Sequence, residues 1–191
     1  MKKVLIRYIL PVLGVIAVVL LDQWTKYLTV TQIGEHGRIV LIDGIFELVY
    51  VKNYGMAWGL FQNKQWLFII MTPIVLGAVI WQYVKMPFEK RFIEFRIMEV
   101  MIAGGAIGNL LDRMFRGEFG QGHVVDMFYV SAINFPVFNV ADSFISVGFV
   151  LMVVYTIFKY TDEDFERMFP FWKKKSVEAD TEDKVTEENK E

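Results

Sequence analysis

Long apolar blocks alternate with short polar segments along this chain, and four of the blocks are long enough to cross a lipid bilayer. A spanning helix needs about 20 apolar residues, each rising about 1.5 Å. The second block carries no charged residue. The pattern therefore predicts four membrane-spanning helices, over residues 8–28, 66–84, 93–114 and 140–160.

The first block begins like a secretory signal peptide, because Lys2, Lys3 and Arg7 precede its apolar core. The apolar region continues through aromatic residues, however, without the small residues that mark a cleavage site. We therefore expect this helix to be retained as a membrane anchor.

The segment between the first two blocks, residues 29–65, has the pattern of a β-hairpin. Strand-forming residues at 38–42 and 45–51 flank Asp43-Gly44, and a two-residue Asp-Gly link between such runs is a strong hairpin signal. The expected fold is an all-α membrane protein: a four-transmembrane-helix bundle with a small extracytoplasmic β-hairpin or sheet between the first two helices. The apolar faces of the hairpin indicate that it rests on lipid or on a substrate.

The composition agrees with a membrane protein, since 54% of the 191 residues are hydrophobic and 16% are aromatic. The chain has no cysteine, which excludes disulfides, thiol catalysis and thiolate metal sites. Its negative charge lies at the C-terminal end, where residues 178–191 hold seven acidic and two basic residues. We expect a membrane-embedded domain over residues 1–160 and a charged, disordered cytoplasmic tail over residues 161–191.

The basic residues predict the orientation in the membrane. With both termini in the cytoplasm, the cytoplasmic segments carry fourteen Lys and Arg residues and the outer segments six, in agreement with the positive-inside rule. This orientation brings polar residues from different segments to the outer face, namely Asp22, Asn109, Asp112, Asp126 and Asp142. Ionisable residues that gather at one depth of a membrane usually face a common cavity, so we expect a shared polar site at the outer leaflet.

Simpler structural explanations exist for some of these residues. Asp22 and Lys26 have the spacing of an ion pair on one helix face, which would close the first span. Asp112 and Arg113 are placed to form a salt bridge at the membrane rim. Neither explanation removes the cluster.

The third block ends in GGAIGNLLDR, a segment that combines small and polar residues. Gly104 and Gly108 have the small-xxx-small spacing that lets helices approach closely. Asn109 and Asp112 share a helix face one turn from the membrane surface. An amide and a carboxylate placed there can hold a neighbouring carboxyl or a substrate backbone in position.

Asp126 and Asp142 form the most informative pair. They flank an apolar segment without other charges, and such surroundings disfavour two negative charges, so two carboxyls that meet there share a proton. Aspartic proteases use this arrangement: one carboxylate takes a proton from water while its partner donates one. Taken alone, the residues favour a structural explanation, because Asn139 three residues before Asp142 is typical of a helix N-cap and Asp126 of an ordinary loop.

If the pair is catalytic, its members are expected to differ in protonation. Asp142 falls in the first turn of the fourth span, where the helix dipole favours a negative charge. Asp126 lies in a connecting segment among apolar residues, where desolvation favours its protonated form. We therefore expect Asp142 to act as the base toward water and Asp126 to hold the shared proton.

Other catalytic classes lack their signatures. No HExxH motif is present, and His36 and His123 are the only histidines, which argues against a zinc protease. No GxSxG motif or phosphate-binding glycine loop occurs. Two alternatives remain: a small proton- or cation-coupled membrane transporter and a structural membrane partner. The absence of an internal repeat and the single depth of the polar residues argue against the transporter.

Five motifs, in this order, resemble lipoprotein signal peptidase, also called signal peptidase II, over about residues 8–160. They are DQWTK, NYGMAWG, GGAIGNLLDR, GHVVDM and FNVADS, which begin at Asp22, Asn53, Gly104, Gly122 and Phe138. The acidic tail departs from the usual short ending of that family. The resemblance implies an intramembrane aspartic endopeptidase of the bacterial cytoplasmic membrane. Such an enzyme removes the signal peptide from diacylglyceryl-modified prolipoproteins, on the amino side of the lipidated cysteine.

The resemblance also implies roles for individual residues. Asp126 and Asp142 match the catalytic pair, and the positions that shape or stabilise the pocket are Asp22, Lys26, Asn53, Gly55, Asn109, Asp112, Arg113 and Asn139. It implies no metal and no organic cofactor, and it implies that the hairpin covers the substrate. The expected partners are prolipoprotein substrates and membrane lipid, with no nucleic acid, and we expect a monomer.

Overall fold

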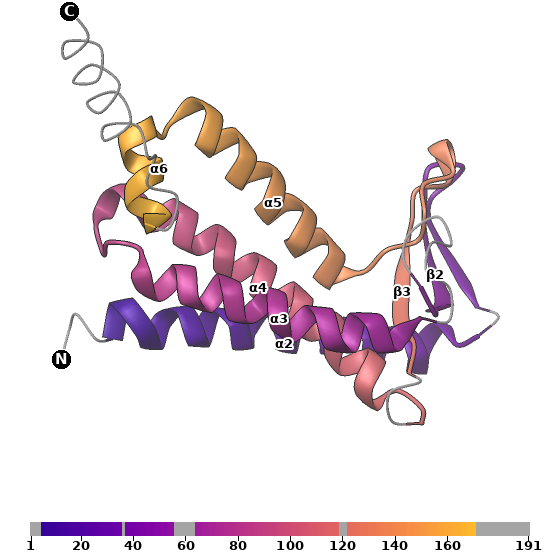
Figure 1. The fold of residues 1–191 in the computed structure, drawn as a ribbon. Helices are drawn as coiled ribbons and strands as arrows, with labels where there is room; N and C mark the ends of the chain where they lie inside the picture. The colour runs from indigo at the N-terminus through magenta and orange to yellow at the C-terminus, as the bar shows by residue number, and fades with distance from the viewer. Residues whose placement is uncertain (1–4, 36, 56–63, 119–121, 171–191) are drawn as a thin grey trace, which may run out of the picture.

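The computed structural model describes residues 5–35, 37–55, 64–118 and 122–170, so residues 56–59 of the NYGMAWG segment lie outside the described residues. Long helices dominate, and a small sheet lies at one end of them (Figure 1). The α-helices are α2 (Leu10–Leu28), α3 (Gln65–Lys85), α4 (Ile93–Phe115), α5 (Val140–Phe158) and α6 (Asp162–Met168). The strands are β1 (Arg38–Ile42), β2 (Phe46–Asn53) and β3 (Val124–Tyr129). Short π- or 3₁₀-helical turns are η1 (Leu5–Ile9), η2 (Thr29–Ile33), η4 (Lys90–Phe92) and η5 (Ser131–Ile133).

The four predicted spans correspond to α2, α3, α4 and α5, whose ends agree within two residues. Three segments of the described chain are long and apolar enough to cross a membrane: Leu5–Ile33, Gln65–Lys85 and Val140–Phe158. Helix α4 is not among them because it is rich in charged residues, namely Glu94, Arg96, Glu99, Asp112 and Arg113. It packs against α2, α3 and α5, so Arg96, Glu99 and Asp112 are buried by protein.

The sheet is antiparallel, in the order β1-β2-β3. A hairpin joins β1 and β2, but its loop is Asp43-Gly44-Ile45 instead of the expected two residues, because Ile42 pairs with Phe46. Gly44 has a φ of +65°, in the left-handed region that glycine adopts readily. A glycine in this conformation is typical of three-residue hairpin loops.

Strand β3 corrects the expectation for Asp126, which lies in a strand and not in a connecting segment. Its neighbours Val124, Val125 and Met127 are buried as well, so both faces of the strand are covered. A strand buried on both faces lacks the alternation of apolar and polar residues that predicts a half-exposed strand. The sequence pattern therefore did not reveal it.

Three glycines of α4 allow close contacts with the neighbouring helices. A Cβ atom on Gly104 would lie 2.6 Å from a side-chain atom of α2, and one on Gly108 would lie 2.6 Å from Oδ2 of Asp22. The expected close approach at these two positions is confirmed. Gly105 does the same toward α5, because a Cβ there would lie 2.4 Å from the carbonyl oxygen of Ala141.

Helix α6 closes the end of the bundle opposite the sheet (Figure 1). Thr161 forms a capping box at its start, and Met168 near its end is fully buried. Met168 belongs to an apolar cluster with Met86, Phe92, Phe95 and Tyr160. The expectation of a disordered tail is therefore wrong for residues 162–168, because their apolar side chains complete a core. Residues 171–191, with the acidic end, lie outside the described residues.

Candidate active site

Asp126, on β3, is almost completely buried, with 1% of its surface exposed. Its Oδ2 accepts a hydrogen bond from Nδ2 of Asn53 at 2.8 Å, and its Oδ1 accepts one from Nδ2 of Asn139 at 2.6 Å. Asp126 pairs with Val51 in the sheet, so Asn53, two residues further along β2, lies on the same face. The sheet thus positions Asn53 against this carboxyl.

Asp142 lies in the first turn of α5, and Asn139 caps the helix. Oδ1 of Asn139 accepts a hydrogen bond from the backbone N–H of Asp142 at 2.9 Å, while Oδ2 of Asp142 accepts one from the backbone N–H of Asn139 at 3.1 Å. The expected N-cap is confirmed as a reciprocal capping box. Oδ1 of Asp142 accepts a further hydrogen bond from Nδ2 of Asn109 on α4, at 2.8 Å.

Asn139 joins the two aspartates. It is fully buried, and its Nδ2 donates both to Oδ1 of Asp126 and to Oδ1 of Asn109, the latter at 3.1 Å. Its Oδ1 is used by the α5 cap. One amide side chain therefore contacts the carboxyl of Asp126 and the backbone of Asp142. Asn139 thus caps α5 and connects the two aspartates at the same time.

A charged cluster lies directly behind Asn109. Nζ of Lys26 lies 2.8 Å from Oδ2 of Asp22, 2.9 Å from Oδ2 of Asp112 and 2.9 Å from Oδ1 of Asn109. An ammonium group has three N–H donors, so these acceptors satisfy it completely, although it is fully buried. The expected ion pair between Asp22 and Lys26 is confirmed. It belongs to a network that holds the oxygen of Asn109 and so turns its Nδ2 toward Asp142.

Asp22 and Asp112 also support the elements that carry the two aspartates. Oδ1 of Asp22 accepts a hydrogen bond from the backbone N–H of Ala141 in the first turn of α5, at 3.0 Å. Oδ2 of Asp112 accepts one from the backbone N–H of Val125 in β3, at 3.2 Å. The buried ion cluster thus fixes both β3 and α5 relative to α4.

Two supporting residues were not singled out from the sequence. Nε2 of Gln23 donates to Asp112 at 3.0 Å and to Asp22 at 3.2 Å, and Nε of Arg116 donates to Asp112 at 2.9 Å. The expected rim salt bridge between Asp112 and Arg113 is wrong, because Arg116 takes that place. Its position four residues after Asp112 was an available signal, whereas Gln23 had none.

Arg113 instead faces the carboxyl pair. Its guanidinium donates to the carbonyl oxygen of Gly55 at 3.2 Å and lies 4.5 Å from the centre of the Phe68 ring. Its charge acts on both Asp126 and Asp142. The expected pocket residues therefore gather around the two aspartates, and Arg113 supplies positive charge beside them.

Burial raises the pKa of Asp126 to about 7, and the negative charge of Asp142 adds to this effect. The hydrogen bonds from Asn53 and Asn139 act in the opposite direction but are smaller. Asp126 therefore retains a proton in much of the population near neutral pH. A protonated carboxyl next to an ionised one can donate to a carbonyl oxygen while its partner accepts a proton from water.

No cluster of three or more His, Asp or Glu side chains that could hold a metal ion occurs within the described ranges. The carboxyl groups of Asp126 and Asp142 can act as an acid and a base.

Comparison with known proteins gives consistent matches. A model of the family described as signal peptidase (SPase) II matches residues 14–158. A lipoprotein signal peptidase from Geobacillus kaustophilus is 41% identical over 151 residues, which cover 77% of this chain and 92% of the relative. A protein of the same name from Lactococcus lactis is 40% identical over 155 residues, which cover 81% of this chain and 94% of the relative.

Two solved structures, both titled as a bacterial membrane enzyme, resemble this fold. One has a TM-score of 0.68 at 27% identity and covers 78% of this chain and 88% of its own. The other has a TM-score of 0.66 at 28% identity and covers 81% of this chain and 96% of its own. The family match ends at residue 158, before α6 begins.

Proposed function

The chain belongs to the signal peptidase II family, and on that premise we propose that it removes signal peptides from diacylglyceryl-modified prolipoproteins, with Asp126 and Asp142 as its catalytic pair. The observation that carries this proposal is the bridge through Asn139, which contacts Asp126 and caps the helix of Asp142. The hydrogen bonds that hold Asp126 and Asp142 can be made within one chain, and we propose that the enzyme acts as a monomer. The comparisons give no support to the transporter alternative.

In the proposed mechanism Asp142 is the base and Asp126 the acid. Asp142 removes a proton from a water molecule, whose oxygen attacks the scissile carbonyl carbon, while Asp126 donates its proton to the carbonyl oxygen. The tetrahedral intermediate then collapses: Asp142 returns its proton to the leaving nitrogen of the lipidated cysteine, and Asp126 takes back the proton of the hydroxyl group. The two N–H donors on Asp142 and the raised pKa of Asp126 support this division of roles.

The membrane arrangement is part of the same proposal. All four long helices span the bilayer, with α4 shielded by the other three, and both termini lie in the cytoplasm. The sheet and the carboxyl pair then lie at the outer leaflet, where the acyl chains of the substrate can remain in lipid. A cysteine at Asp43 should react with an impermeant thiol reagent from outside, and one at Lys90 should not. The reverse labelling pattern would refute this orientation.

The decisive experiment is cleavage of a purified precursor by the purified protein. We expect a diacylglyceryl-modified precursor to yield a fragment whose first residue is the lipidated cysteine, identified by mass spectrometry. The same precursor without the lipid should remain uncut. Proton or cation uptake by proteoliposomes, without any cleavage, would favour the transporter instead.

A further inference from the structure

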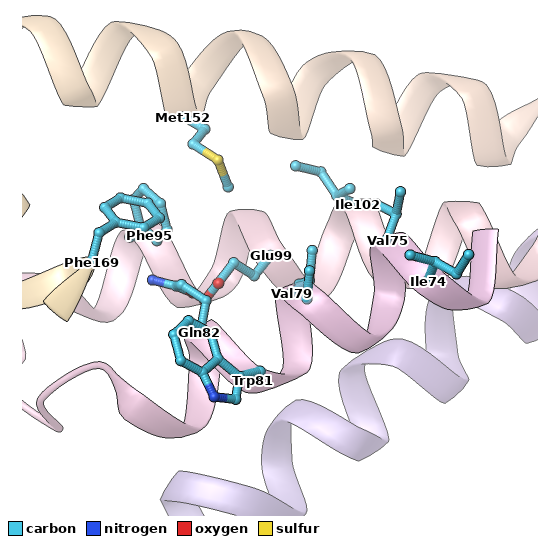
Figure 2. A pocket seen from close by; sticks show the side chains of 11 residues that line it. Ile74, Val75, Val79, Trp81, Gln82, Phe95, Glu99, Ile102, Met152 and Phe169 are labelled. Carbon is cyan, nitrogen blue, oxygen red and sulfur yellow. The ribbon is translucent and has the colours of Figure 1, made fainter. Parts of the chain in front are cut away.

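A groove of about 430 Å³ runs between α3 and α5, over α4, in the half of the bundle remote from the sheet. Most of its lining is apolar, but Gln82 of α3 and Glu99 of α4 are part of it. Figure 2 shows both polar side chains between the rings of Phe95 and Phe169 on one side and the aliphatic chain of Val75 on the other. The groove is thus an apolar slot with two polar side chains within its length.

The two polar side chains are buried, and each has an oxygen without a hydrogen-bond donor. Glu99 is 4% exposed and Gln82 is 6% exposed. Nε2 of Gln82 donates to the carbonyl oxygen of Met168 at 3.2 Å, which fixes the amide. Within the described part of the chain, Oε1 of Gln82 and Oε2 of Glu99 have no partner. Buried acceptors of this kind are destabilising until a donor reaches them.

Arg96 does not supply that donor. Its charge acts on Glu99, but its terminal N–H groups donate to carbonyl oxygens at the end of α3, including those of Tyr83 at 3.1 Å and Met86 at 2.8 Å. Glu99 also borders a second apolar cavity next to α2, which Gln82 does not reach. The groove between α3 and α5 is therefore the cavity that both residues line.

The distance from Gln82 and Glu99 to the two aspartates matches the length of the apolar core of a signal peptide. Glu99 precedes Asn109 on α4 by ten residues, and Met152 of the groove follows Asp142 on α5 by ten, which is about 15 Å in each case. The apolar core of a signal peptide has about 7–15 residues. As a helix it would span about 10–22 Å. The segment before that core carries Lys or Arg residues, whose side chains donate hydrogen bonds and accept none.

We propose that Glu99 and Gln82 bind the basic side chain that precedes the apolar core of the substrate's signal peptide. The apolar core lies in the groove, and the cleavage site reaches Asp126 and Asp142 at the other end. This inference rests on the proposed function and adds a determinant of substrate recognition that is about 15 Å from the reacting bond. Glu99 and Gln82 are specificity-determining residues and take no part in the chemistry.

The test compares two lipidated precursors that differ at one position before the apolar core, one with a single lysine there and the other with glutamine. For the lysine precursor, Glu99→Gln should raise KM about tenfold without changing kcat, as the loss of one charge-assisted hydrogen bond predicts. For the glutamine precursor, KM should be the same as with the wild type. The matched control is Glu94→Gln, because Glu94 pairs with Lys159 at 2.7 Å outside the groove, and it should change neither value.

The isosteric Glu99→Gln change should not lower the thermal stability measured in detergent, because it removes a buried carboxylate oxygen that has no donor. If that variant fails to fold, Gln82→Met removes the other oxygen at similar length and should raise KM for the lysine precursor about threefold. A KM increase shared by both precursors would assign Glu99 to the fold or to a bound lipid and overturn the proposal, as would no increase at all. Failure of the wild type to cut either precursor would instead refute the proposed function.

Discussion

Helix α4 carries buried polar residues at both ends, and the two sets differ in how completely their hydrogen-bonding groups are paired. Toward the sheet, both side-chain oxygens of Asp112 and both the oxygen and the nitrogen of the Asn109 amide are hydrogen-bonded. Toward α6, two buried atoms have no hydrogen-bond partner among the described residues: Oε2 of Glu99 and Nε of Arg96. The same helix thus combines a completed network with an incomplete one.

The difference indicates two different tasks. A completed network holds its members in one geometry, so that no reorganisation is needed when a reaction begins. An incomplete one is costly for the protein alone and is satisfied by a ligand with matching donors. We therefore assign catalysis to the completed network near the sheet and substrate recognition to the incomplete network in the groove. Four predictions test the assignment of catalysis to the completed network.

The largest effect is expected from removing the acid–base groups. Asp126→Asn and Asp142→Asn should each lower the cleavage rate by about 10²–10⁴-fold, because an amide cannot exchange the proton. Each variant should remain folded and inserted in the membrane, as monitored by detergent-extracted yield and circular dichroism. The exposed Asp43→Asn change in the hairpin loop is the control and should leave the rate unchanged. Full processing by either site variant would refute the assignment.

The next effect concerns the stability of the completed cluster. Lys26→Met should lower the free energy of unfolding by about 3–5 kcal/mol, because it leaves the buried carboxylates Asp22 and Asp112 without their shared cation. Lys52→Met removes a lysine from an exposed ion pair with Glu35 and should leave stability unchanged. Equal stability losses in the two variants, measured by denaturant titration in detergent, would contradict the view of Lys26 as the centre of the network.

A smaller effect is expected from the contact between α4 and α2. Gly108→Ala would place its Cβ 2.6 Å from Oδ2 of Asp22, and should destabilise the protein by about 1–3 kcal/mol. Gly77→Ala in α3 meets nothing within 4 Å, so it should be neutral or stabilising by about 0.5–1 kcal/mol. Thermal unfolding of both variants checks this, and a harmless Gly108→Ala change would show that the helices can separate there at little cost.

The smallest effect is the pH dependence near neutrality. Because the pKa of Asp126 is about 7, the cleavage rate should fall by up to about tenfold per pH unit above pH 7, as the acid loses its proton. The unfolded chain releases this proton near the ordinary value of 3.8, so the folded state binds more protons between these values. The stability contributed by this carboxyl is therefore lost as the pH rises from about 4 to about 7.

Infrared spectroscopy can assign that proton. The band of the protonated carboxyl should disappear near pH 7 in the wild type and be missing in Asp126→Asn. In Asp142→Asn it should persist with a lower midpoint, because the neighbouring negative charge no longer raises the pKa of Asp126. If the aspartate left in Asp126→Asn kept its proton to a higher pH than the aspartate left in Asp142→Asn, the roles within the pair would be reversed.

Features that depend on residues close together in the chain could be predicted from the sequence. The ends of the long helices follow from the lengths of the apolar blocks, and the hairpin follows from Asp43-Gly44 between two strand-forming runs. The cap of α5 by Asn139 and the pair of Asp22 with Lys26 follow from spacings of three and four residues. In each case the residues involved are close together in the chain, so the local pattern is enough.

Only the tertiary structure decided which distant groups meet. Asn139 reaches Asp126 across 13 positions, Lys26 reaches Asn109 across 83, and Asp22 binds the backbone of α5 across 119. These contacts exist because α2, α4 and α5 pack closely and because β3 is buried on both faces. The spacing of Gly104 and Gly108 indicates a close helix contact but not which helix makes it, and a strand buried on both faces leaves no periodic signal. The same reason explains why α6 and the unpaired oxygens in the groove emerge only once the helices are assembled.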